Sequence, residues 1–269
     1  MRRIVFVGRR PVLESRNPNL VLPSAERVET VLGPTRLADS RVHVEARDAT
    51  GAALQVHVLP EADIEIIESS GLRAYPLRTA WRDLDHNDFR LVGTARQKAD
   101  WVLNHGFCSR CAAPTELDPD TEGLRCSECA QIHYPRIAPA VIVLVQRGRE
   151  ALLGRSPRFP EGVYSTLAGF VEPGETLEEC VHREIEEESG VRVHNLRYFG
   201  SQSHPFPHSL MVGFVADWLD GDLRIDPREL ADAQWFDVDD LPQRPHPRSI
   251  AFRLIEDFER RARGEHDSR

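Results

Sequence analysis

Hydrophobic and polar positions alternate in two stretches of the N-terminal third of the chain. They cover 41–45 (Arg-Val-His-Val-Glu) and 54–58 (Leu-Gln-Val-His-Val), with Gly51 between them. Period two is typical of strands with one buried face, and a glycine-containing connection favours a hairpin. We therefore expect residues 1–93 to form an α+β domain around this hairpin.

A helical spacing of apolar residues follows between positions 94 and 105. Ala95, Ala99, Val102 and Leu103 recur at intervals that place them on one side of a helix. The helix leads into a short segment, 108–135, that is rich in turn-forming residues and holds four of the chain's five cysteines. We expect 94–135 to be a second domain, consisting of a linker helix and a cysteine-rich module.

The pattern changes again after residue 135. A continuous apolar run at 140–145 predicts a buried strand, and a polar turn separates it from a second strand at 151–154. Helical periodicity covers 176–189 and returns near the C-terminus, where Ile250, Leu254, Ile255 and Phe258 share one face. Further strands are expected at 193–201, 211–218 and 234–237. This mixture predicts a third domain, 136–269, and an α+β fold class for the chain.

Composition and charge exclude several classes of protein. Apolar residues make up 41% and charged residues 29% of the chain, which is typical of a folded protein and not of a disordered one. A formal charge of -9 argues against a protein that wraps nucleic acid through a broad basic surface. The sequence contains neither an apolar run long enough to cross a membrane nor a signal-peptide core. We expect a cytoplasmic protein without a membrane partner.

The predicted helix at 176–189 carries an unusual concentration of acidic residues. Thr176 and Glu179 form a capping-box pattern at its start, and Gly190 stands where a left-handed C-cap belongs. Glu184, Glu187 and Glu188 follow at spacings that place all three carboxylates on one face. The three negatively charged carboxylates repel one another unless a cation lies between them. Hard ions such as Mg²⁺ or Mn²⁺ take oxygen ligands, so we expect a divalent-metal site here.

Two neighbouring features complete this candidate site. Arg183 is placed to hold one of the carboxylates by a charge-assisted hydrogen bond. The loop 169–174 contains two glycines and Pro173, and its backbone can approach a phosphate chain closely. The acidic face and the loop together predict a metal site that binds phosphates.

The segment 169–191 resembles the Nudix box, the pattern Gly-x5-Glu-x7-Arg-Glu-apolar-x-Glu-Glu-x-Gly-apolar, at every defined position. The resemblance implies an α/β/α Nudix sandwich with a mixed sheet. It also implies that Glu184, Glu187 and Glu188 hold the metals and that water attacks phosphorus there. Glu175 is expected to support the loop, and Cys180 to be a buried structural thiol.

Four cysteines form two CxxC pairs, separated by 14 residues, and they are Cys108, Cys111, Cys126 and Cys129. This spacing is typical of a structural Zn²⁺ site, because four thiolates fill a tetrahedral ion completely. Two disulfides, or free core cysteines, are the alternative. Ribbons of this kind also bind nucleic acid, but Glu116, Asp118, Asp120 and Glu122 make this one acidic, which argues against that role.

An N-terminal domain, a four-cysteine ribbon and a Nudix domain in this order resemble the NADH pyrophosphatase (NAD diphosphatase) family, from about residue 94 onward. The likeness is carried by the segments 133–139, 167–172, 195–198, 226–230 and 254–257. The family's signature has the form Ser-Gln-Pro-Trp-Pro-Phe-Pro-x-Ser, and the chain has Ser201-Gln-Ser-His-Pro-Phe-Pro-His-Ser209. Ser203 and His204 depart from it, which bears on the preference for NADH over other dinucleotides.

The resemblance implies a set of substrate-binding residues, namely Phe170, Tyr134, Ser201, Gln202, Pro205, Phe206, Ser209 and Ala251. Phe170 and Tyr134 would sandwich the base, with Tyr134 reaching across the interface of a homodimer. The backbone at Ala251 would meet the base. Glu229 would be a further metal ligand from outside the helix.

The expected activity is metal-dependent hydrolysis of NADH or NAD⁺ to nicotinamide mononucleotide and AMP. By resemblance, removal of NAD caps from RNA is a second expected activity. A broader hydrolase acting on ADP-ribose or other nucleoside-diphosphate derivatives is the alternative enzyme. From a different class, a non-catalytic regulator that senses a nucleotide is a further alternative, which the complete set of Glu184, Glu187 and Glu188 disfavours.

Overall fold

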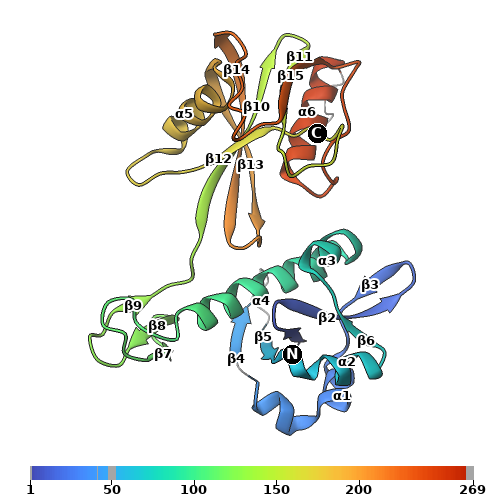
Figure 1. The fold of residues 1–269 in the computed structure, drawn as a ribbon, viewed down its shortest axis with the longest axis vertical. Helices are drawn as coiled ribbons and strands as arrows, with labels where there is room; N and C mark the ends of the chain where they lie inside the picture. Colours follow the sequence, from blue (N-terminus) through green and yellow to red (C-terminus); the bar gives the residue numbers. More distant parts are fainter. Residues whose placement is uncertain (1, 41, 48–52, 265–269) are drawn as a thin grey trace. The chain divides into compact units, whose positions relative to one another are not determined.

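The structure, a computed structural model, describes residues 2–40, 42–47 and 53–264. Contacts within the chain divide it into two compact units, Met1–Arg136 and Ile137–Arg269 (Figure 1). Each unit has hydrophobic clusters of its own.

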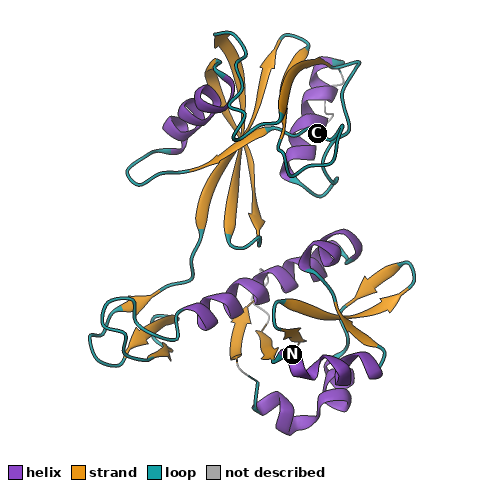
Figure 2. Ribbon diagram, in the orientation of Figure 1, coloured by secondary structure: helices purple, strands orange, loops and turns teal. Residues whose placement is uncertain are grey.

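The N-terminal unit is built on a six-stranded sheet with helices (Figure 2). Its elements are β1 (Arg2–Val7), β2 (Arg10–Arg16), β3 (Asn19–Val21), α1 (Ala25–Ala38), β4 (Val42–Arg47), β5 (Ala53–Leu59), η1 (Glu61–Asp63), α2 (Ile64–Ser69), β6 (Leu72–Ala74), α3 (Leu77–Asp83) and α4 (His86–Asn104). The strand order is β3-β2-β1-β5-β4, and β6 pairs with β2. The expected hairpin is confirmed by the antiparallel pair β4 and β5, while Arg41 and Gly51 lie outside the described residues.

Helix α4 is longer than the sequence pattern predicts. We expected it from Thr94, but it begins at His86, where the side chain of Asp85 accepts a hydrogen bond from the backbone N–H of Asn87 at 2.8 Å. The first turn after this cap is polar, so apolar periodicity could not reveal it. The α4 segment then continues into the ribbon, whose strands are β7 (Thr115–Asp118), β8 (Gly123–Cys126) and β9 (Ile132–His133).

The C-terminal unit is a mixed sheet with a helix on each side. Its elements are β10 (Ala138–Arg147), β11 (Glu150–Arg155), β12 (Leu167–Phe170), α5 (Leu177–Ser189), β13 (Arg192–His204), β14 (Ser209–Asp220), β15 (Asp232–Asp237) and α6 (Ile250–Ala262). The strand order is β13-β14-β10-β11-β15, and β12 pairs with β10. Strands β10 and β14 are parallel, whereas the neighbouring pairs are antiparallel. The expected α+β class with a mixed sheet is therefore confirmed.

Helices α5 and α6 lie on opposite sides of this sheet (Figure 1). Val141 and Val143 of β10 pack with α5 residues such as Val181, whereas Ile142 and Leu144 pack with α6 residues such as Leu254. Successive residues of a strand point to opposite faces, so the apolar run at 140–145 supplies both cores. We refer to these two sides as the α5 face and the α6 face.

Strand β12 is the element of this unit that the sequence pattern did not predict. We treated Gly169 and Phe170 as part of a loop, but they are the last two residues of β12, with Gly169 paired to Val141. Four residues that include a glycine show no alternation strong enough to indicate a strand. In the described part of the chain, no helix combines the length and the apolar character needed to cross a lipid bilayer.

Candidate active site

Helix α5 has firmly defined ends. The Thr176 hydroxyl accepts a hydrogen bond from the Glu179 backbone N–H at 3.2 Å, and the Glu179 carboxylate accepts one from the Thr176 N–H at 2.8 Å. This reciprocal pair is the expected capping box. At the other end Gly190 adopts a left-handed conformation with φ 73°, which favours glycine. The positions of the acidic residues along α5 are therefore fixed.

The three expected metal ligands on α5 differ in their exposure. Glu188 is only 7% exposed, and its Oε2 atom is buried without a hydrogen-bond partner among the described residues. The Glu184 side chain is 15% exposed, whereas that of Glu187 is 62% exposed. The cluster thus runs from a buried carboxylate to one in contact with solvent.

Glu188 has the most perturbed pKa of the cluster. Burial and the nearby carboxylates of Glu184, Glu229 and Glu187 raise its pKa to about 8. Burial also raises the pKa of Glu184. Glu229 lies near Glu188 because the backbone N–H of Asp226 donates to the Glu188 carbonyl at 3.2 Å, which fastens the 226–229 turn to the end of α5. Three further carboxylates, those of Glu184, Glu187 and Glu229, therefore lie close enough to Glu188 to raise its pKa.

Arg183 binds more acceptors than the single carboxylate we expected. Its guanidinium donates to Glu175 at 2.7 and 2.8 Å, to Glu184 at 2.9 Å and to Glu187 at 3.2 Å. It also donates to the backbone carbonyl of Phe170 at 3.0 Å. This bidentate pairing lowers the pKa of Glu175 to about 2. Arg183 and Glu175 thus tie the end of β12 to the acidic side of α5.

Gly169 lies directly against the Glu184 carboxylate. A Cβ atom built on Gly169 would come within 1.8 Å of the Glu184 carboxyl carbon. Any larger residue would therefore displace this carboxylate. Cys180 is fully buried, as expected, and burial raises the pKa of its thiol to about 12.

The carboxylates fit a hard divalent cation. A buried oxygen without a donor, surrounded by further carboxylates, is an environment that is unfavourable for the protein alone and favourable once a cation neutralises it. Glu184, Glu187, Glu188 and Glu229 are the residues that would hold such an ion. Their donor set, oxygen throughout, is the one that Mg²⁺ and Mn²⁺ prefer.

Several expected substrate-binding residues lie on the α6 face. One row of paired residues crosses four strands, and its members are Phe170, Ala140, Met211 and Gln202. Ser209 lies two residues further along β14 on the same face, and it is buried. Phe170 is 56% exposed at the edge of the sheet. Ala251 is buried in the first turn of α6 and packs in the core of this face.

The other expected residues do not join this row. Ser201 pairs with Val212 of β14, and Val212 pairs with Val141 of β10. Val141 also pairs with Gly169 and faces α5, so Ser201 lies on the α5 face. Pro205 and Phe206 lie in the turn between β13 and β14, where Pro205 is buried. Tyr134 is 58% exposed in the N-terminal unit, whereas Phe170 belongs to the C-terminal unit.

Gly213 shapes the α6 face and was not among the expected residues. A Cβ atom on Gly213 would lie 2.9 Å from Cδ1 of Ile250, so the glycine makes room for the first residue of α6. A glycine inside an otherwise apolar strand is the sequence signal for such a close approach.

The four ribbon cysteines converge on one point. Their sulfur atoms all lie within 4.8 Å of one another, with Cys111 and Cys126 separated by 3.4 Å and Cys108 and Cys129 by 3.6 Å. Tetrahedral Zn²⁺ with Zn–S bonds of about 2.3 Å requires sulfur separations of about 3.8 Å. All four are free thiols, which disfavours the disulfide alternative. Backbone N–H groups of Cys129 and Glu128 lower the pKa of Cys126 to about 6, which favours the thiolate that zinc binds.

Comparison with known proteins assigns the two C-terminal modules. Residues 135–258 match the model of the NUDIX domain, and residues 103–134 match that of the NADH pyrophosphatase zinc ribbon domain. The chain is similar to the protein named NAD-capped RNA hydrolase NudC of Chromobacterium violaceum, with 54% identity over 180 residues, 67% of this chain and 68% of that protein.

Further relatives agree with this result. The protein of the same name from Stutzerimonas stutzeri is 50% identical over 186 residues, 69% of this chain and 67% of that protein. Among solved structures, a NUDIX hydrolase from Nitrosomonas europaea is 28% identical with a TM-score of 0.47, covering 61% of this chain and 93% of that one. The two domain matches and the identity to the proteins of Chromobacterium violaceum and Stutzerimonas stutzeri support one conclusion, that the chain belongs to the NADH pyrophosphatase family of Nudix hydrolases.

Proposed function

We propose that the chain hydrolyses the pyrophosphate bond of NADH or NAD⁺, releasing nicotinamide mononucleotide and AMP. The observation that carries the proposal is the buried Glu188 oxygen without a donor, set among Glu184, Glu187 and Glu229. The two relatives named above are called NAD-capped RNA hydrolases, which supports an NAD-type substrate and adds capped RNA as a second one.

Mg²⁺ or Mn²⁺ is the proposed catalytic cofactor, and Zn²⁺ is the structural one. When bound, the divalent ions neutralise charge on the diphosphate and make water more acidic. Arg183 and Glu175 hold the carboxylates and the β12 end in place. Phe170, on the opposite face of β12 from Gly169, offers an exposed ring on which the base of the substrate stacks.

We further propose that the enzyme works as a cytoplasmic homodimer, in which Tyr134 of one protomer covers the base stacked on Phe170 of the other. Four cysteines that converge at zinc-ligand spacing, in place of a disulfide frame, support a reducing compartment. Within the chain we retain three proposed domains, 1–93, 94–135 and 136–269.

The dimer proposal can be tested by complementation. Tyr134→Ala and Phe170→Ala each remove one side of the base sandwich. If the two side chains come from different protomers, mixing these two weakly active proteins after dissociation creates one intact site per heterodimer and restores activity. If both side chains come from one protomer, every site keeps a defect and mixing restores nothing.

The substrate proposal is tested by incubating the protein with Mg²⁺ and, separately, NADH, NAD⁺, ADP-ribose, diadenosine polyphosphates and NAD-capped RNA. Formation of AMP from NADH or NAD⁺ is expected, with Glu188→Gln as the inactive control. Selective turnover of ADP-ribose would instead favour the broader hydrolase. Tight binding of a nucleotide without any turnover would favour a regulator. Because Ser203 and His204 depart from the family signature, the ratio of NADH to ADP-ribose turnover is the decisive number.

A further inference from the structure

Both polar atoms of the Gln202 side-chain amide bind the start of α6. Its Nε2 atom donates to the backbone carbonyl of Arg248 at 2.7 Å, and its Oε1 atom accepts from the backbone N–H of Ile250 at 2.8 Å. These two backbone groups flank Ser249, the N-cap of α6. A single amide therefore fixes the backbone on both sides of the cap.

These two hydrogen bonds, which we call the Gln202 clamp, act on the part of α6 that covers the same face of the sheet as Phe170. Ile250 is 2% exposed and fits into the space that Gly213 leaves on β14. Ala251 follows directly and is 5% exposed. Gln202 itself stands in the same cross-strand row as Phe170, through Met211 and Ala140. The first turn of α6 is thus bound to a residue of the same cross-strand row that contains Phe170.

The backbone N–H groups of the first turn of α6 differ in whether they have a hydrogen-bond acceptor. The N–H of Ile250 goes to Gln202, and the N–H of Phe252 goes to the Ser249 hydroxyl at 3.1 Å. The N–H of Arg253 goes to the Ser249 carbonyl at 3.2 Å. For the N–H of Ala251, the described residues offer no acceptor. Backbone donors at a helix start remain open to an external acceptor when no cap engages them.

We infer that Gln202 is a positioning residue: it docks the first turn of α6, with the Ala251 N–H, on the sheet face that carries the Phe170 ring, and it acts on substrate binding through this docking. The inference rests on the proposed function for the identity of the ligand. The two backbone hydrogen bonds fix the orientation of the Gln202 amide, so loss of the side chain removes both bonds that hold the start of α6.

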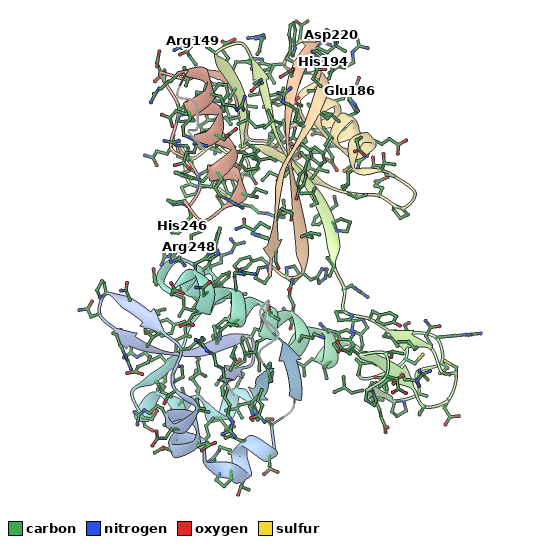
Figure 3. The ribbon with its side chains drawn as sticks, turned by 180° about the vertical axis from the view of Figure 1, so that it is seen from behind. Arg149, Glu186, His194, Asp220, His246 and Arg248 are labelled. Carbon is green, nitrogen blue, oxygen red and sulfur yellow. The ribbon has the colours of Figure 1, made fainter. Side chains whose placement is uncertain are left out.

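The chain offers a matched control at the other end of the same helix. The side chain of Gln146 accepts from Arg261 of α6 at 2.9 Å and donates to Asp217 at 2.8 Å. It also links a strand to α6 through its amide, but far from the first turn. Figure 3 shows Arg248 and His246 at one end of the C-terminal unit and Arg149, which donates to the carbonyl of Ala262, at the other.

The test compares Gln202→Ala with Gln146→Ala in the full-length protein by two measurements. Hydrogen exchange of the Ile250 amide in the free protein is expected to accelerate in Gln202→Ala only. In steady-state hydrolysis of NADH, the KM of Gln202→Ala should rise about tenfold with kcat changed far less, whereas Gln146→Ala keeps both constants. If Gln202→Ala does not fold, Gln202→Met serves instead, since it keeps a side chain of similar length but loses both the acceptor for Ile250 and the donor to Arg248.

Each other outcome overturns the inference. A raised KM with unchanged exchange at Ile250 would mean that Gln202 contacts the substrate directly. Faster exchange with an unchanged KM would mean that the clamp is structural only. Failure of the wild-type protein to hydrolyse NADH would instead defeat the proposed function, while the exchange measurement, which needs no substrate, would still decide whether the clamp exists.

Discussion

Gly169 of β12 lies directly against the carboxylate of Glu184 of α5. A Cβ atom on Gly169 would lie 1.8 Å from the carboxyl carbon of Glu184, so even a methyl group would overlap it. We therefore predict that Gly169→Ala displaces Glu184 and lowers kcat by about 100-fold, as a misplacement on the order of 1 Å does. Gly200→Ala, where a Cβ atom would meet nothing within 4 Å, is the control and should retain activity. An unchanged kcat for Gly169→Ala would show that the position of Glu184 is not critical.

We predict that Glu188 supports turnover and lowers the stability of the metal-free protein. Glu188→Gln is expected to reduce turnover by on the order of 100- to 1000-fold, because it removes a charged ligand from the site. In the metal-free protein near pH 7.5 the same change should raise the melting temperature by about 2–4 °C. Burial and three neighbouring carboxylates raise the pKa of Glu188 to about 8, so folding at this pH requires the side chain to take up a proton, whereas glutamine is neutral in both states. The exposed Glu186, on the same helix, provides the control Glu186→Gln, which should change neither quantity. A metal-free Glu188→Gln protein that melts lower than wild type would contradict this account.

Zinc removal is expected to weaken the fold and not the chemistry. Cys111→Ser deprives a four-thiolate site of one ligand, so bound zinc should fall below one equivalent and the melting temperature should drop by more than about 5 °C. Metal analysis and calorimetry measure the two effects. Cys180→Ser, at the buried thiol of α5, should keep one equivalent of zinc. A normal melting temperature for zinc-depleted Cys111→Ser would refute the structural role.

The pair formed by Arg197 and Asp217 predicts a pH-dependent term in stability. Arg197 donates to Asp217 at 2.7 and 2.9 Å, which lowers the pKa of Asp217 to about 2 from an ordinary value of 3.8. A depressed carboxyl pKa stabilises the fold above the ordinary value, and this contribution is lost as the pH falls from about 4 to about 2. Asp217→Asn should therefore cost about 1–2 kcal/mol at pH 7 and progressively less below pH 4. Urea unfolding of both proteins across this range measures the difference, and a constant difference would exclude the pair as its source.

Removal of divalent cations should abolish hydrolysis reversibly. With EDTA and then excess Mg²⁺ or Mn²⁺, activity is expected to vanish and return, because the carboxylates around Glu188 need a cation to bind a diphosphate. Retention of zinc during a mild treatment is checked by metal analysis. Full activity in the absence of free divalent ions would contradict the assignment of Glu184, Glu187, Glu188 and Glu229 as ligands.

Sequence patterns predicted the elements whose signal is local. The capping box at Thr176 and the left-handed conformation of Gly190 could be predicted because helix caps depend on residues that are neighbours in the sequence. The continuous run at 140–145 predicted β10, since a central strand is apolar on both faces. The two CxxC pairs predicted a four-thiol centre because ligand spacing within each pair is local as well.

Contacts between segments that are far apart in the sequence could not be predicted from such local patterns. The parallel pairing of β10 with β14, and with it the row from Phe170 to Gln202, depends on which strands become neighbours. The multiple contacts of Arg183 depend on where β12 ends relative to α5. Gln202 was expected to bind substrate because of its place in a signature. Its hydrogen bonds to residues 248 and 250 could only be found once α6 had been placed on the sheet.

Gly169 and Phe170 are consecutive residues of β12 and belong to opposite faces of the sheet. The glycine borders the Glu184 carboxylate, and the aromatic ring is the proposed stacking surface for the base. The proposed reaction and the proposed recognition of the base would thus use alternate positions of one short strand. Substitutions at Phe170 are therefore expected to change which nucleotide binds while they leave the acidic cluster intact.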